Sequence, residues 1–150
     1  DQQLQELQAA ARTLGIQVEA LKAGTPNEID NAFANAVQRR AGALHMAGDA
    51  FFNTRKEQLI VLSARHALPT VFSLREFPAA GGLMSYGPSL ADAYLQQGIY
   101  AGRILKGEKP AEMPVQQTVK VELVINVQTA KTLGLSIPLP LLGRADEVIE

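Results

Sequence analysis

Segments with a helical repeat alternate with short apolar segments along most of this 150-residue chain. Helices are predicted where apolar residues recur every three or four positions, and strands where apolar or alternating runs lie between turn residues. Regular alternation of this kind is typical of a parallel sheet with right-handed crossovers and helices on both faces. The sequence therefore predicts a single α/β domain over residues 1–150, a three-layer α/β/α fold with a mostly parallel sheet.

Local signals place the individual elements. Thr25 and Glu28 form a predicted capping box with Pro26 at the first helical position, and Thr54 to Glu57 resembles a second capping box. Ser89 is the predicted cap of a long helix that ends at Gly107. The predicted helices begin at residue 2, Thr25, Asn53 or Thr54, Ser89 and Asn126. The predicted strands cover residues 16–21, 43–47, 68–73, 82–86 and 119–127. The tail after residue 135 is predicted to form turns with one helical turn.

The sequence predicts an apolar face on two of these elements. Residues 119–127 alternate, so this strand is expected to have one buried and one solvated side. The long helix carries a single stripe along its length. The stripe consists of Leu90, Ala93, Tyr94, Gln97, Ala101, Ile104 and Leu105.

Composition excludes several functions. The net charge is −1, so the chain has no basic field for nucleic acid or an anionic membrane. No apolar run approaches the roughly 20 residues that span a bilayer. Cysteine is absent, and the two histidines, His45 and His66, do not form a metal motif. No GxGxxG or GxSxG motif occurs, and no cofactor is expected.

In open α/β sheets, ligands bind beyond the carboxyl ends of the strands. Three loops follow predicted strands here, at residues 48–53, 74–82 and 85–89. They offer carboxylates for a cation or hydroxyl, aromatic rings for stacking and hydroxyls for hydrogen bonds. The candidate ligand-binding residues are Asp49, Phe51, Phe52, Glu76, Ser85 and Tyr86.

Ordinary structural roles remain open for the same residues. Asp49 fits a turn, and either phenylalanine fits the core. Arg75 and Glu76 could form a solvated ion pair, and Tyr86 could pack at a strand end.

The stretches "GGLMSYG" (81–87), "ILKGEKPAEMPV" (104–115), "ELVINVQTAKTLGLSIP" (122–138) and "RADEVIE" (144–150) resemble the substrate-binding proteins of bacterial ABC importers. This resemblance implies a type I periplasmic-binding-protein fold, in which two lobes close on a small ligand. It implies a periplasmic or extracellular protein that hands its ligand to a membrane permease. Some members bind aromatic amino acids or related compounds.

A full member of this family is about twice as long, so the resemblance implies that this chain is the second lobe with the C-terminal crossover segments, and that the N-terminal lobe is absent. Gly81, Gly82 and residues 115–120 are then the expected crossings between lobes, with the two glycines as a hinge. The helix over 89–106 would belong with the absent lobe. Alone, its apolar stripe could pair with another copy as a homodimer.

The leading hypothesis is therefore a solute-binding component of an ABC import system. One alternative is a ligand-sensing regulatory domain of the same fold without a transport role. An α/β hydrolase-like enzyme is a third, and the placement of the histidines argues against it.

Overall fold

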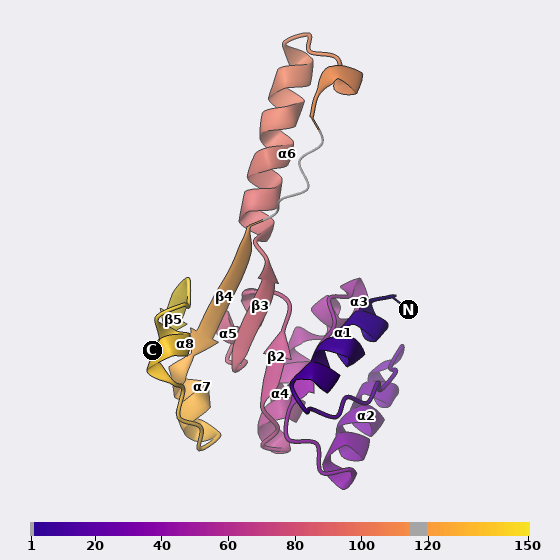
Figure 1. Ribbon diagram of the computed structural model, residues 1–150, viewed down its shortest axis with the longest axis vertical. Coiled ribbons are helices and arrows are strands. Elements are labelled where there is room, and N and C mark those ends of the chain that lie inside the picture. Colours follow the sequence, from indigo (N-terminus) through magenta and orange to yellow (C-terminus); the bar gives the residue numbers. More distant parts are fainter. Residues whose placement is uncertain (1, 115–119) are drawn as a thin grey trace.

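The fold is built on a five-stranded sheet. A computed structural model describes residues 2–114 and 120–150, with side chains from residue 4 onward. The strand order is β1-β2-β3-β4-β5; β1 to β3 run parallel, β4 is antiparallel to β3, and β5 is parallel to β4 (Figure 1). The strands are β1 (Leu44–His45), β2 (Thr70–Phe72), β3 (Met84–Pro88), β4 (Val121–Asn126) and β5 (Glu147–Ile149). The predicted α/β class is confirmed.

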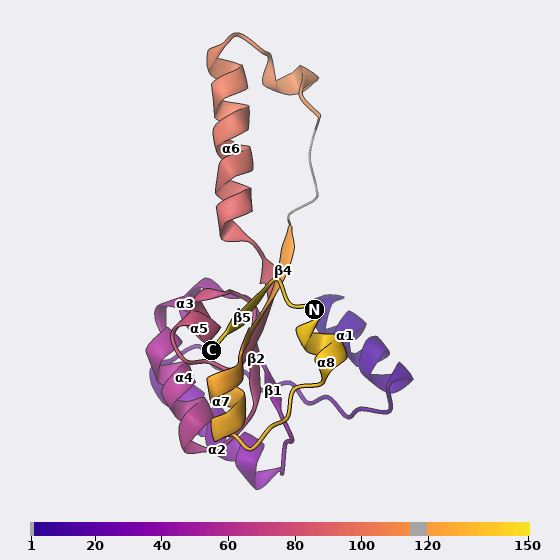
Figure 2. The same cartoon turned by 90° about the vertical axis from the view of Figure 1, so that its left-hand side faces the viewer.

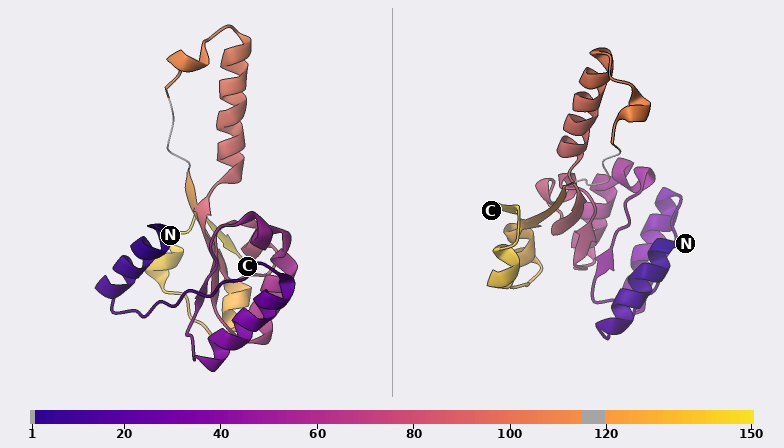
Figure 3. Two further views of the ribbon diagram at one scale, coloured as in Figure 1. Left: turned by 90° about the vertical axis from the view of Figure 1, so that its right-hand side faces the viewer. Right: turned by 45° about the horizontal axis from the view of Figure 1, so that its top comes forward.

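Helices lie on both faces of this sheet. The structure has α1 (Gln2–Thr13), α2 (Pro26–Gln38), α3 (Ala50–Thr54), α4 (Lys56–Arg65), α5 (Glu76–Ala79), α6 (Leu90–Leu105), the 3₁₀ turn η1 (Pro110–Glu112), α7 (Val127–Thr132) and α8 (Leu139–Leu142). Figure 2 shows α1 and α8 on one side of the sheet and α4 and α5 on the other. The right-hand view of Figure 3 places α1 and α8 near opposite ends of the sheet.

The core lies between α2, α4 and β2. Phe72 is fully buried, and its ring stacks on Phe77 of α5 with 4.3 Å between centroids. One face of α2 and one face of α4 supply most of the rest of this core, because their apolar residues recur at helical spacing. The buried side chains of the cluster are Ile29, Phe33, Ala36, Leu59, Leu62, Leu68, Phe72 and Phe77.

The structure confirms some predicted caps and corrects one. Thr25 and Glu28 form the predicted capping box of α2. The predicted capping box at Thr54 is wrong: the Thr54 hydroxyl donates to the Phe51 carbonyl oxygen at 2.7 Å and completes the end of α3. α4 instead begins after Arg55, whose side chain makes no capping hydrogen bond. Ser89 and Asn126 cap α6 and α7 as predicted.

The strand predicted over residues 16–21 does not form. A groove of about 710 Å³ lies beside this segment, lined by Ile16, Val18, Phe33, Leu44 and Met46 among others. The segment is held to the end of α2 by the ion pair between Arg39 and Glu19, at 2.5 Å. A strand needs a neighbouring strand for its backbone hydrogen bonds, and the edge of β1 lies across the groove.

Two predictions at the other end of the sheet are also corrected. β4 is buried on both sides over its second half, where Leu123, Val124, Ile125 and Asn126 are all buried. α5 packs against β4, and the Asn126 side chain donates to the Pro78 carbonyl oxygen of this helix, so the side predicted to be solvated is covered there. β5, which was not predicted, pairs with the edge of β4 in the same sheet. Residues 115–119, the greater part of one predicted crossing, lie outside the described residues.

The second structural region is an arm, defined here as residues 89–114. α6 and η1 project away from the sheet (Figure 1), and α6 has no buried residue. The arm has internal contacts: Arg103 Nε donates to Glu108 Oε2 at 2.8 Å, and the Tyr100 hydroxyl donates to the Pro114 carbonyl oxygen. The hydrogen bond from Arg103 lowers the pKa of Glu108.

Candidate ligand-binding rim

The carboxyl ends of β1, β2 and β3 lie at one edge of the sheet because these strands are parallel and adjacent. This edge is called the rim here, and it consists of residues 46–52, 73–76 and 86–89. The antiparallel strand β4 begins at the same edge. The rim is therefore the place where the predicted ligand loops can meet.

Close backbone contacts show that the three loops do meet. A Cβ added at Gly48 would lie 3.3 Å from Ser73 Oγ, and one added at Gly87 would lie 2.0 Å from the Ser73 carbonyl oxygen. Ser73 thus touches the backbone of the loops on both sides. Gly87 is required at its position because any side chain would collide with backbone rather than with a movable side chain.

Four predicted site residues lie in the first two loops. The Asp49 carboxylate caps α3 by accepting from the Phe51 backbone N–H at 2.7 Å. Phe51 and Phe52 are half-buried and pack against the core, with 5.6 Å between their ring centroids. Glu76 is exposed at the start of α5. These positions leave Asp49 and Glu76 open to solvent.

The two predicted residues of β3 differ sharply in exposure. Tyr86 is 62% exposed, whereas Ser85 is 1% exposed and lies in register with Phe72 and Val124. Tyr86 therefore presents an apolar ring and a hydroxyl to solvent at the rim, while the Ser85 side chain is enclosed in the sheet. Successive side chains of a strand point to opposite faces of the sheet, which explains the difference in exposure between Ser85 and Tyr86.

Gly81 and Gly82 lie at the opposite end of β3. They form the turn between α5 and β3, with Gly81 at φ +102°. Gly82 is buried against Phe72 and Phe77, and a Cβ there would lie 2.9 Å from the Phe72 ring. The chain leaves the domain for the arm at Pro88 and Ser89 instead, so the glycine pair does not lie at that crossing.

Charged residues outside the predicted site surround the first residues of β4. Arg75 forms ion pairs with Glu147 and with Glu122, the latter at 3.8 Å. Its guanidinium is therefore engaged by two carboxylates, and neither of them is Glu76, the partner considered from the sequence. No sequence signal pointed to Glu122 or Glu147, because they belong to strands distant from Arg75 in the chain.

The described residues contain no group of histidines and carboxylates that could hold a metal ion. Within the same residues, no helix is long and apolar enough to cross a membrane.

The rim offers exposed carboxylates, an exposed tyrosine and partly buried aromatic rings. Sites for small molecules combine apolar and aromatic side chains with a few polar groups, and the rim carries groups of both kinds.

Comparison with known proteins identifies the class as a binding protein. Residues 1–149 match the model of the family described as "ABC transporter substrate binding protein". The chain belongs to this family, which consists of binding proteins rather than enzymes. No curated protein sequence matches the chain.

Solved structures agree on the fold. A protein from Streptococcus pneumonia, described as an ABC domain in complex with L-Trp, has 27% identity and a TM-score of 0.85 over 99% of this chain and 50% of its own. A conserved domain protein from Vibrio cholerae has 23% identity and a TM-score of 0.84, over 98% of this chain and 49% of its own.

A ligand-free, open substrate-binding protein with adhesive properties from Clostridium difficile has 20% identity and a TM-score of 0.67, over 98% of this chain and 49% of its own. The chain therefore spans about half the length of each of these three structures.

Proposed function

We propose that this chain is one lobe of a solute-binding protein of an ABC import system and that it holds a small molecule at the rim. Family membership and the convergence of three strand-end loops on Ser73 support this proposal. The exposed Tyr86 beside Gly87 is the observation that carries the site. Asp49, Phe51, Phe52 and Glu76 are the other proposed contacts, with Ser85 supporting the strand from within.

A second lobe is proposed to cover the rim. The chain spans about half of the similar solved structures. The arm projects with exposed apolar side chains, including Tyr94, Leu95 and Leu105, and the groove beside β1 leaves part of the core open. Further polypeptide packed on these surfaces would cover the exposed apolar side chains of the arm and fill the groove beside β1. In the chain alone, the arm is the surface through which two copies would form a homodimer.

The proposed ligand class is an aromatic amino acid or a related compound. One similar structure is in complex with L-Trp, and aromatic side chains line this rim. Aromatic rings stack on one another with an energy of about 0.5–1.5 kcal/mol beyond burial. The exposed carboxylates Asp49 and Glu76 would pair with the ammonium group. The protein is proposed to work outside the cytoplasm and to deliver this ligand to a membrane permease.

Calorimetric titration of the complete protein with L-tryptophan tests the proposal. Replacing Tyr86 by alanine is expected to weaken binding by roughly tenfold, since about 1.4 kcal/mol is a factor of ten. Leu139→Ala is the matched control, because Leu139 is 81% exposed in α8, away from the rim. Unchanged affinity in Tyr86→Ala would remove Tyr86 from the site. No binding of L-tryptophan, L-phenylalanine or L-tyrosine would overturn the ligand class.

A further inference from the structure

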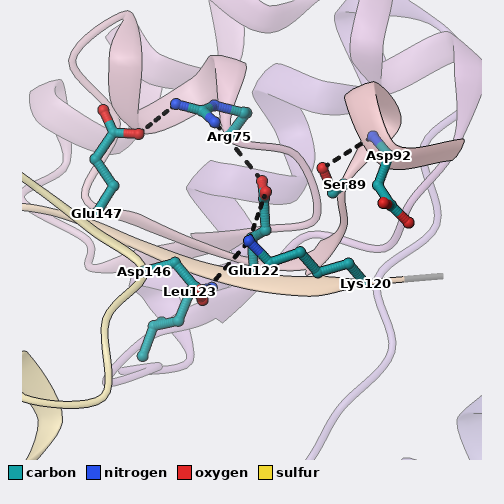
Figure 4. A network of polar contacts seen from close by, with 8 residues as sticks. All are labelled: Arg75, Ser89, Asp92, Lys120, Glu122, Leu123, Asp146 and Glu147. Carbon is teal, nitrogen blue, oxygen red and sulfur yellow. Dashed lines mark hydrogen bonds and ion pairs between the residues drawn. The ribbon is translucent and has the colours of Figure 1, made fainter. Parts of the chain in front are cut away.

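A cluster of charged side chains surrounds the point where the arm joins the sheet (Figure 4). It is called the root cluster here, and its members come from three separate segments of the chain. Arg75 precedes α5, Lys120 and Glu122 belong to the start of β4, and Asp146 and Glu147 belong to the start of β5. The cluster consists of Arg75, Lys120, Glu122, Asp146 and Glu147.

Glu122 lies at the centre of the root cluster and is the most buried of its side chains, at 11% exposed. Lys120 Nζ lies 3.6 Å from one carboxylate oxygen, and Arg75 lies 3.8 Å from the other. The oxygen that faces Arg75 has no hydrogen-bond partner among the described residues. A carboxylate so far from water is costly unless paired, so its position depends on these two cations.

Arg75 connects this carboxylate to the rim. It directly precedes α5, in the loop that contains Ser73, and its guanidinium reaches both Glu122 and Glu147. Figure 4 shows the guanidinium between these two carboxylates. The planar fork of arginine suits contact with two partners at once. The rim loop is thereby tied to β4 and to β5.

Lys120 connects the same carboxylate to the arm. Its backbone carbonyl accepts a hydrogen bond from the Ser89 N–H at 2.7 Å, and Ser89 caps α6 through the Asp92 N–H. The ammonium group of Lys120 also lies 3.7 Å from Asp146. Asp146 in turn accepts from the Leu123 N–H at 2.9 Å. A continuous set of contacts therefore runs from Arg75 through Glu122 and Lys120 to the first residue of the arm.

We propose that Glu122 and Arg75 form a clasp that fixes the direction in which the arm leaves the domain and couples it to the rim loop. Both residues are positioning residues, since they act through the backbone of β4 and through Ser89. In the two-lobe protein proposed above, the clasp would set the orientation of the lobes. This last consequence depends on the proposed function, whereas the clasp itself does not.

Distances between spin labels test the clasp in this chain without any ligand. The sequence contains no cysteine, so cysteines introduced at Ala64 in α4 and Gln97 in α6, both exposed, are the only labelling sites. Electron double resonance then measures the distance distribution from domain to arm. Glu122→Gln and Arg75→Gln are each expected to broaden this distribution about twofold, because the uncoupled arm samples more directions.

The double variant separates coupling from general loosening. If the two residues act through one contact, Arg75→Gln with Glu122→Gln broadens the distribution no more than either single change. Additive broadening would show independent structural effects and overturn the clasp. Lys120→Gln provides a variant at a half-exposed position that does not endanger the core, and it is expected to broaden the distribution as well.

Glu19→Gln is the matched control, because it removes an ion pair far along the chain from the root cluster and should leave the distribution unchanged. Circular dichroism establishes that each variant is folded. An unchanged distribution in the Lys120, Arg75 and Glu122 variants would overturn the clasp and leave the binding proposal intact. Failure of L-tryptophan to bind the complete protein would count against the binding proposal and leave the clasp intact.

Discussion

One helix of the domain, α2, and one helix of the arm, α6, have similar amphipathic patterns and opposite environments. α2 places Ile29, Phe33 and Ala36 in the core, each at most 2% exposed. α6 carries an apolar stripe of the same kind, yet Tyr94 is 67% exposed and Leu105 is 88% exposed. An amphipathic helix is thus stabilised in one case by tertiary packing and in the other by its cap and its own hydrogen bonds. Amphipathic pattern alone does not determine what covers a helix.

The largest expected difference between the two regions comes from deleting an aromatic ring. Phe72→Ala should lower the free energy of unfolding by about 3–5 kcal/mol, because the ring is fully buried against Phe77. Tyr94→Ala on the arm should change it by less than about 0.5 kcal/mol. Urea unfolding of the chain measures both. Equal losses would show that the arm packs on the domain in solution.

A second comparison uses two glycines. Gly87→Ala should cost about 3 kcal/mol, since the added methyl group meets the Ser73 backbone at 2.0 Å. Gly98→Ala in α6 should stabilise the arm by about 0.5–1 kcal/mol, since its Cβ meets nothing within 4 Å and alanine favours a helix. Thermal unfolding followed by circular dichroism distinguishes them. A tolerated Gly87→Ala would mean that the rim loops are farther apart than described.

Helix caps provide a smaller difference. Asn126→Ala should cost about 1–2 kcal/mol, because its side chain both accepts from the Thr129 N–H and donates to the Pro78 carbonyl oxygen. Ser89→Ala should instead increase amide exchange in the first turn of α6 while the core amides keep their protection. Hydrogen exchange by NMR reads both regions in one sample. Faster exchange of core amides in Ser89→Ala would contradict the separation of the arm.

The smallest expected effect is a change in stability at low pH. Hydrogen bonds from the Gly24 and Thr25 backbone lower the pKa of Glu28 below its ordinary value of 4.5. A carboxyl group whose folded pKa is lowered contributes stability above its unfolded pKa, and this contribution is lost as pH falls through the folded pKa. Below pH 4.5, wild type and Glu28→Gln should therefore converge in stability, because the protonated carboxyl group has lost its advantage.

Glu108→Gln is the matched change on the arm, where the hydrogen bond from Arg103 lowers the pKa of Glu108. It should leave the unfolding midpoint of the domain unchanged at every pH. Urea midpoints measured from pH 3 to pH 7 compare the two variants. A difference between wild type and Glu28→Gln that grows as pH falls would contradict the direction of the pKa shift.

Much of the local structure was predictable because its causes are local. Thr25, Ser89 and Asn126 cap helices as their side chains predict, since a cap needs only residues within three positions. The positions of Asp49 after β1 and of Glu76 after β2 followed from the predicted strands, whereas Tyr86 lies within β3, which extends to Pro88. The prediction for residues 16–21 was wrong because a strand also needs a neighbour, and alternation does not show whether one is present.

The sequence by itself determined the fold class, the order of most elements, the family and the three loops that meet at the rim. Only the tertiary structure showed that Ser85 is enclosed while Tyr86 is exposed, and that Arg75 is engaged by Glu122 and Glu147. It also showed that Gly81 and Gly82 lie at the opposite end of β3 from the arm. The physical reason is range: capping, turns and helical periodicity act between near neighbours, whereas burial and ion pairing depend on segments that the fold brings together.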